Sequence, residues 1–164
     1  MFKPTSERKR KRKRKRNNVN GLIIFVKNPE LGKVKTRIAK DAGDDKALEI
    51  YKKLLGYTQG ISSALPVKRY VFYGDYIQSQ DLWSSKSYEK YAQEKGDLGL
   101  RMYAAFEKIA SKSKKMLLIG SDCTQISSST LIKAYTVLDK KDVVIGTTLD
   151  GGYYLIGMKI FQRL

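Results

Sequence analysis

Two spacings of apolar residues alternate along the chain. Continuous apolar runs are typical of strands that a sheet buries on both faces, and segments with apolar residues at helical spacing lie between them. The runs predict strands over residues 22–26, 70–73, 116–119, 143–145 and 153–158, with a short strand near 88–92. The helical spacing predicts helices over 44–60, 98–109 and 131–138.

This alternation of strands and helices indicates the fold class. Strand–helix–strand units are right-handed and place their strands in parallel, so we expect an α/β protein with a mostly parallel sheet and helices on both faces. Ligands of such sheets bind beyond the carboxyl ends of the strands. Three predicted strand ends carry polar or glycine-rich residues, and these ends hold the candidate chemistry.

The loop after the first predicted strand gathers positive charge. Gly32 permits a sharp turn, and Lys33, Lys35 and Arg37 follow at the start of a short predicted helix. Arginine and lysine side chains bind phosphate, so the loop favours a nucleotide or phosphate site; a solvated basic helix face fits the spacing equally well. A P-loop is excluded, because Val34 stands where a serine or threonine would hold magnesium.

Two acidic residues follow later strands. Asp122 comes directly after the strand at 116–119, where a carboxylate can hold Mg²⁺ or Mn²⁺ or can cap the next helix. Asp150 precedes Gly151, Gly152 and Tyr153, and this segment is either a substrate-binding loop, with Asp150 as a catalytic candidate, or a hairpin turn.

A third candidate segment opens the helix at 98–109. Asp97 precedes that helix, and Arg101 lies one turn inside it. A simple helix start explains both residues. The alternative is a loop that faces the ligand, with Asp97 as a second candidate for catalysis and Arg101 as a phosphate-binding residue.

The composition excludes several mechanisms. The chain of 164 residues has no histidine and one cysteine, which excludes Ser-His-Asp and Cys-His catalysis, histidine-ligated metal, a disulfide framework and a cysteine-rich zinc site. No apolar run approaches the ~20 residues that span a bilayer, so we expect no membrane span. No apolar stretch that could serve as a secretory signal lies near the start, so we expect a cytoplasmic protein.

The positive charge is concentrated at the start of the chain. The formal net charge is +17, and ten of the 33 basic residues lie within residues 1–18. We expect these residues to form a disordered basic tail, because like charges repel and no apolar residue anchors them, and residues 19–164 to form one domain. The tail is either a low-complexity extension or a segment that binds polyanions without sequence specificity; the remainder shows no recognisable module for specific nucleic-acid binding.

Four motifs, in this order, resemble a known family. They are Lys27-Asn28-Pro29 with Gly32–Arg37, Gln93 with Gly96–Gly99 and Arg101-Met102, Gly120–Cys123, and Asp150–Gly157. They are similar to the small GT-A-like transferases of bacteria and archaea that were long classed as a domain of unknown function. Some members are glycosyltransferases of arsenosugar biosynthesis. The resemblance covers residues 21–160.

The resemblance implies a fold and a reaction. The family belongs to the nucleotide-diphospho-sugar transferase superfamily, which implies a three-layer α/β/α, Rossmann-like GT-A fold, a nucleotide over the first loop and Mg²⁺ or Mn²⁺ near Asp122. The implied activity is transfer of a sugar from a nucleoside diphosphate to a small-molecule acceptor. The alternatives are nucleotidyl transfer from an NTP, as in the related phospholactate guanylyltransferases, and an inactive fragment or polyanion-binding protein. The family normally continues beyond residue 160, so we expect the fold to be incomplete at its C-terminal end.

Overall fold

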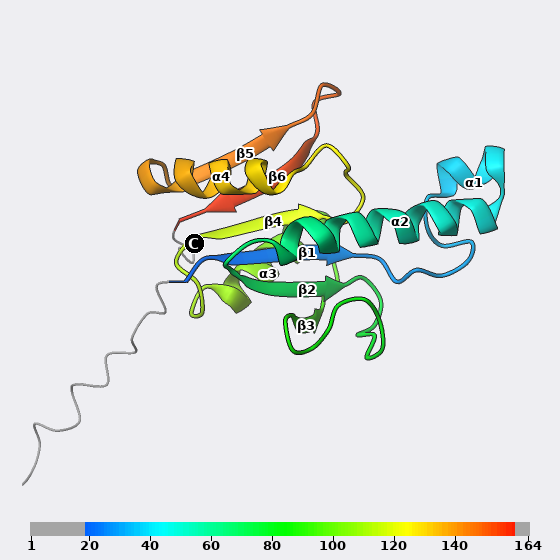
Figure 1. Cartoon of the computed structure of the whole chain (residues 1–164), viewed down its shortest axis with the longest axis horizontal. Coiled ribbons are helices and arrows are strands. Elements are labelled where there is room, and N and C mark those ends of the chain that lie inside the picture. The colour runs from blue at the N-terminus through cyan, green and yellow to red at the C-terminus, as the bar shows by residue number, and fades with distance from the viewer. Residues whose placement is uncertain (1–18, 160–164) are drawn as a thin grey trace, which may run out of the picture.

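The computed structural model describes residues 19–159 and shows a six-stranded sheet between helices (Figure 1). The predicted basic tail, residues 1–18, lies outside the described residues, so its disorder and the domain boundary stay predictions. The strands are β1 (Gly21–Val26), β2 (Lys68–Tyr73), β3 (Glu89–Ala92), β4 (Met116–Gly120), β5 (Val143–Thr147) and β6 (Tyr153–Met158). The helices are α1 (Thr36–Ala42), α2 (Asp44–Ser63), α3 (Leu98–Ile109) and α4 (Ser128–Lys140).

The sheet is mostly parallel, as the sequence predicts. Its strand order is β3-β2-β1-β4-β6-β5, and β1 pairs in parallel with both β2 and β4. Only β6 among these strands runs antiparallel, since it pairs that way with β4 and with β5. The carboxyl ends of β1 and β4 therefore meet at one edge, which the loop between β5 and β6 also joins.

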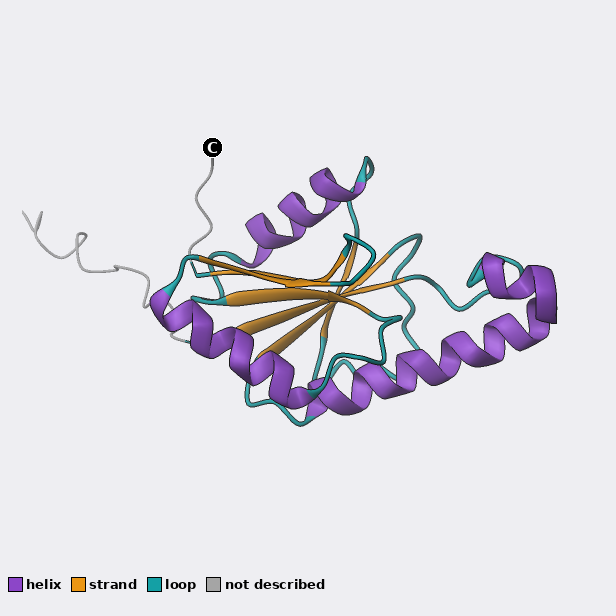
Figure 2. Ribbon diagram, turned by 90° about the horizontal axis from the view of Figure 1, so that it is seen from above, coloured by secondary structure: helices purple, strands orange, loops and turns teal. Residues whose placement is uncertain are grey.

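Two apolar clusters hold the helices against opposite faces of the sheet. One contains Tyr51 and Leu55 of α2 together with Leu131 and Leu138 of α4. The other contains Phe106 and further residues of α3. Figure 2 shows the sheet on edge between these helices. Burial of apolar side chains from both sides explains why the central strands read as continuous apolar runs, and it confirms the three-layer α/β/α prediction.

Helix α1 stands apart from this core. It buries none of its own residues and packs against the far end of α2, away from the sheet (Figure 1). The segment between β1 and α1 is anchored by Val34, which is 2% exposed and belongs to the α2-side cluster. Within residues 19–159, no helix is both long enough and apolar enough to cross a bilayer.

Candidate active site

The loop after β1 separates its two central lysines. Buried Val34 lies between them, so the side chains of Lys33 and Lys35 leave in different directions. Lys33 forms an ion pair with Glu30 and is 65% exposed, whereas Lys35 is 22% exposed and reaches the end of β4. The ion pair with Glu30 raises the pKa of Lys33. The sequence pattern predicts the same phosphate-binding role for both lysines, but within residues 19–159 of the structure only Lys35 of the two lines a cavity.

Lys35 has an unusual backbone conformation. Its φ of 49° and ψ of 45° lie in the left-handed region, and it is the only non-glycine residue among 19–159 with a positive φ. This conformation costs a residue with a β-carbon about 1 kcal/mol. Such strain is concentrated at functional sites in proteins, and here it directs the Lys35 side chain toward β4.

Asp122 meets Lys35 at the carboxyl edge of the sheet. Phe25 of β1 is paired in register with Gly120 of β4, so Lys27 and Asp122 each lie two residues beyond this pair. Lys35 Nζ donates to Asp122 Oδ2 at 3.1 Å, and the Asp122 side chain is 60% exposed. Asp122 does not cap the next helix, because Ser127 caps α4 by accepting from Thr130 N–H.

Tyr51 of α2 joins the ends of β1 and β4. Its hydroxyl accepts a hydrogen bond from Lys27 N–H at 2.9 Å and lies 3.1 Å from both the Lys27 carbonyl oxygen and Ser121 Oγ. Burial raises the pKa of Tyr51, so the phenol keeps its proton at neutral pH. The hydroxyl thereby fixes the spacing between the loop that carries Lys35 and the strand end that carries Asp122.

A cavity of about 370 Å³ and a cavity of about 470 Å³ flank Asp122 and share it as a lining residue. We call the larger one the basic cavity. Lysine and arginine side chains contribute three of its lining residues, and an acidic side chain contributes one. Its lining residues are Lys27, Val34, Lys35, Thr36, Arg37, Ile38, Tyr51 and Asp122.

The loop between β5 and β6 forms one wall of the other cavity. It is a hairpin turn, as one of the two interpretations predicted, closed by a hydrogen bond from Thr148 N–H to the Gly152 carbonyl at 2.9 Å. Asp150 accepts from the Thr148 hydroxyl and from Gly152 N–H. The hydrogen bond from Thr148 and that from Gly152 lower the pKa of Asp150, so it is a carboxylate at neutral pH.

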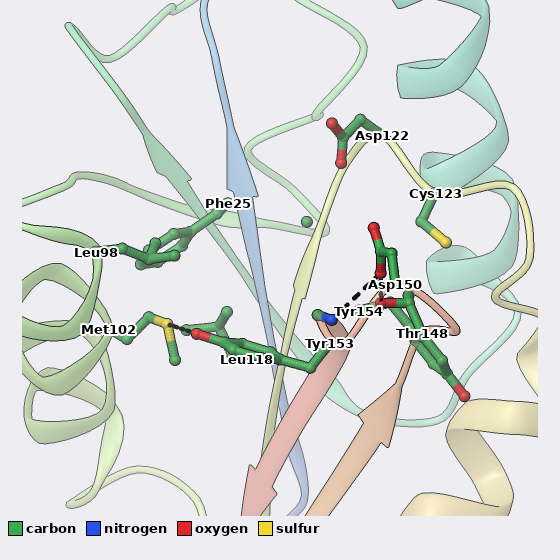
Figure 3. A pocket seen from close by; sticks show the side chains of 12 residues that line it. Phe25, Leu98, Met102, Leu118, Asp122, Cys123, Thr148, Asp150, Tyr153 and Tyr154 are labelled. Atoms are coloured by element: carbon green, nitrogen blue, oxygen red, sulfur yellow. Dashed lines mark hydrogen bonds between the residues drawn. The ribbon is translucent and has the colours of Figure 1, made fainter.

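The second cavity, which we call the apolar cavity, is lined mostly by carbon. Figure 3 shows Asp122 and Asp150 at one side of it and Leu98, Met102 and Phe25 at the other. Its lining residues are Phe25, Leu98, Met102, Leu118, Gly120, Asp122, Cys123, Thr148, Asp150, Gly152, Tyr153 and Tyr154.

Six predicted site residues therefore line the two cavities. Lys35 and Arg37 line the basic cavity, and Asp122 lines both cavities. The apolar cavity is also lined by Asp150, Gly152 and Tyr153.

The other five predicted residues line neither cavity. Gly32 and Gly151 serve turns, with φ values of 73° and 84°, and Lys33 pairs with Glu30. Asp97 caps α3 by accepting from Leu100 N–H at 2.8 Å, as the simple helix-start interpretation predicted. Arg101 Nη1 donates to Gln93 Oε1 at 3.0 Å, while its buried Nε has no partner among the described residues.

Sequence reasoning missed the residues that shape the two cavities. Tyr51 occupied a position in an apolar helical stripe, and only its hydroxyl could have distinguished it from a core residue. Phe25, Leu98 and Met102 also lie in apolar patterns, so nothing local marked them as cavity residues. Their place at the cavity follows from contacts between segments far apart in the chain.

The donor set beside Asp122 fits a hard divalent cation in part. Asp122 and Asp150 line the same cavity, and Mg²⁺ is usually held by one or two carboxylates, with water and substrate phosphate as its other ligands. Within residues 19–159, no group of three or more cysteine, aspartate and glutamate side chains forms a metal site. A cation would therefore depend on substrate oxygens for several of its ligands.

The mostly parallel sheet between two layers of helices is the fold of the nucleotide-diphospho-sugar transferases. Residues 59–164 match the model of the family described as uncharacterized proteins conserved in bacteria (DUF2064). The chain belongs to this family, which confirms the resemblance that the four motifs indicated. A comparison with curated proteins gave no match.

Solved structures share this fold. A putative nucleotide-diphospho-sugar transferase from Desulfovibrio desulfuricans G20 is 32% identical, with a TM-score of 0.77; the match covers 87% of this chain and 64% of that protein. The 4-diphosphocytidyl-2C-methyl-D-erythritol synthase of Anaerococcus prevotii is 12% identical, with a TM-score of 0.55, over 87% of this chain and 70% of that one. Rv0371c of Mycobacterium tuberculosis, in complex with manganese, is 11% identical, with a TM-score of 0.54, over 85% of this chain and 70% of that one. The last two show the fold alone.

Proposed function

We propose that this site transfers a sugar from a nucleoside-diphosphate donor to a small-molecule acceptor, with the help of Mg²⁺ or Mn²⁺. The observation that carries the proposal is the contact of Lys35 with Asp122 at the boundary between the two cavities. A diphosphate bridged to a cation needs positive side chains on one side and a carboxylate on the other. The likeness to the transferase from Desulfovibrio desulfuricans supports the same proposal.

Each side chain has a distinct role in this proposal. Lys35 and Arg37 bind the diphosphate from the basic cavity and stabilise the charge that develops on it as it leaves. Asp122 holds the cation, and Asp150 serves as its second ligand or accepts the proton of the acceptor hydroxyl. The cation, when bound, neutralises the leaving diphosphate. Gly152 and Tyr153 contact the sugar or the acceptor in the apolar cavity.

The strain at Lys35 provides a sharp test of nucleotide binding. Lys35→Gly removes the lysine ammonium group. It also relieves a left-handed backbone that costs about 1 kcal/mol, and it increases the conformational entropy of the unfolded chain, which costs stability of similar size. We therefore expect the melting temperature to stay within a few degrees of wild type and the Kd for UDP or GDP with Mg²⁺ to rise at least tenfold. Calorimetric titration measures the Kd.

The matched control is the neighbouring Lys33, which points away from the cavity. Lys33→Gly should change the same Kd by less than twofold. Equal losses in the two variants would show that the loop acts only through its total charge. Unchanged binding in both would remove the basic loop from the site.

A product assay separates sugar transfer from the nucleotidyl alternative. Sugar transfer releases a nucleoside diphosphate from UDP- or GDP-sugars, whereas nucleotidyl transfer releases pyrophosphate from an NTP. We expect nucleoside-diphosphate release that requires Mg²⁺ or Mn²⁺ and that Asp122→Asn abolishes. Because the Asp122 side chain is 60% exposed, the same variant should lose little stability. Pyrophosphate release would overturn sugar transfer in favour of the alternative.

A further inference from the structure

The walls of the apolar cavity differ sharply from those of the basic cavity. Leu98 and Met102 lie one turn apart on α3 and face the cavity beside Phe25 (Figure 3). The Tyr153 hydroxyl donates to Met102 Sδ at 3.5 Å, which places the tyrosine ring along this wall. Apolar and aromatic side chains of this kind bind apolar or ring-shaped ligand groups.

The charges of this cavity are all of one sign. Asp122 and Asp150 contribute two carboxylates, and no lysine or arginine is among the described residues that line it. The hydrogen bonds that keep Asp150 ionised come from within its own hairpin. Like charges repel more strongly beside apolar walls than in open water, so a ligand with its own phosphate or carboxylate would be disfavoured here.

A divalent cation held by Asp122 and Asp150 would weaken this preference without reversing it. It would reduce the repulsion, but its free positions would be taken by water and by the diphosphate from the basic cavity. Lys35 pairs with Asp122 from the basic cavity and offsets part of its charge. No ion pair to Asp150 is found among residues 19–159, and its carboxylate accepts only from its own hairpin, so the apolar cavity stays negative. The apolar cavity thus contains hydroxyl-binding and ring-binding groups, with no group that pairs an anion.

We infer that the acceptor bound in the apolar cavity is an uncharged hydroxyl compound with an apolar or aromatic group, and not a phosphorylated or carboxylic acid. That this ligand is the acceptor rests on the proposed function, whereas its chemical class rests on the cavity walls alone. The ring lies against Tyr153 and Met102, and the hydroxyl faces Asp150. About 370 Å³ falls within the range of small-ligand sites.

A pair of probes with the same ring tests the charge preference. Phenyl β-D-glucoside is neutral and carries hydroxyls, and phenyl phosphate is an anion. With [¹³C]methyl-methionine labelling, the Met102 methyl reports from inside the cavity, and the Met116 methyl, which is 1% exposed in the opposite half of β4, is the internal control. Because the reporter is local, phenyl phosphate bound in the basic cavity does not register as binding here.

We expect phenyl glucoside to shift the Met102 resonance and leave Met116 unmoved. Phenyl phosphate should require a roughly tenfold higher concentration for an equal shift, which corresponds to a difference of about 1.4 kcal/mol. Mg²⁺ should not reverse the preference for phenyl glucoside over phenyl phosphate. An equal or stronger effect of phenyl phosphate, with or without Mg²⁺, would overturn the inference. A Met102 resonance that neither probe moves would overturn it as well.

A charge substitution at the cavity wall provides the second arm. Leu98 is 48% exposed and lines the cavity, whereas Leu100 is 52% exposed and does not. Leu98→Lys should weaken phenyl glucoside and strengthen phenyl phosphate at the Met102 reporter, and Leu100→Lys should change neither. If both variants behave alike, the cavity wall does not select the ligand.

Nucleotide titration on the same samples distinguishes this inference from the proposed function. If the protein binds neither UDP nor GDP but phenyl glucoside still shifts the Met102 resonance as expected, the proposed function is refuted and the inferred ligand class of the apolar cavity stands. Normal nucleotide binding with no preference for the neutral probe would do the reverse.

Discussion

Tyr51→Phe should remove the hydroxyl link between the loop after β1 and the end of β4 while keeping the buried aromatic ring. The substitution keeps the aromatic ring, which is 3% exposed, and deletes a hydroxyl bonded to Lys27 and Ser121. A typical hydrogen bond contributes about 1 kcal/mol net, and a buried group left without its partner costs about 1–3 kcal/mol. Ser121 is 4% exposed, so we expect a loss of about 2–3 kcal/mol in the free energy of unfolding.

Urea unfolding measures this loss, and Tyr57→Phe is its matched control. Tyr57 lies on the same helix, is 39% exposed, and donates one hydrogen bond to the Ile126 carbonyl, so its loss should be about 1 kcal/mol or less. Only Tyr51→Phe should also raise the Kd for a nucleoside diphosphate, since only Tyr51 lines the basic cavity. Equal destabilisation by the two variants, or unchanged nucleotide affinity in Tyr51→Phe, would refute the role assigned to this hydroxyl.

Three further predictions test the packing and charge of the fold. The folded pKa of Asp150 lies below its ordinary value of 3.8, so the hydrogen bonds to its carboxylate stabilise the hairpin above pH 3.8, and this stabilisation is lost as the pH falls through the folded pKa. NMR titration of the Asp150 carboxyl should give a midpoint below 3.8, and Thr148→Val should raise that midpoint. Lys90→Met should cost about 3 kcal/mol by calorimetry, because Lys90, 8% exposed, pairs with a carboxylate that is 9% exposed. Gly157→Ala should lower the melting temperature, since its new β-carbon would lie 3.0 Å from a backbone oxygen of β4, while Gly56→Ala, with open space around it, should raise it.

The fold could be predicted from the sequence because its signals are local. The run 22–26 is apolar throughout since β1 lies at the centre of the sheet and is covered on both faces. The helical stripes marked α2, α3 and α4 for the same reason, and the carboxyl edge followed from parallel strands. The resemblance of four motifs supplied the superfamily, which the family match and the Desulfovibrio desulfuricans structure confirm.

The candidate site was only partly predictable because it depends on direction and distant contacts. Sequence placed Lys33 and Lys35 in one basic loop, but the left-handed backbone at Lys35 decides which of them reaches Asp122. Asp97 fits both a cap and a catalytic acid in sequence, and its hydrogen bond to Leu100 N–H shows the cap. The role proposed for each site residue stays a prediction.

The hairpin between β5 and β6 bears on how proteins of this architecture diversify. Its loop, residues 148–152, is closed by its own backbone and side-chain hydrogen bonds, and none of its residues lines the basic cavity. Surface loops tolerate insertions and deletions far better than the strands they join. Substitutions in this turn at positions other than Asp150 would therefore alter the wall of the apolar cavity and leave the lining of the basic cavity unchanged. Under the proposed function, two homologues could in this way share a donor and differ in acceptor.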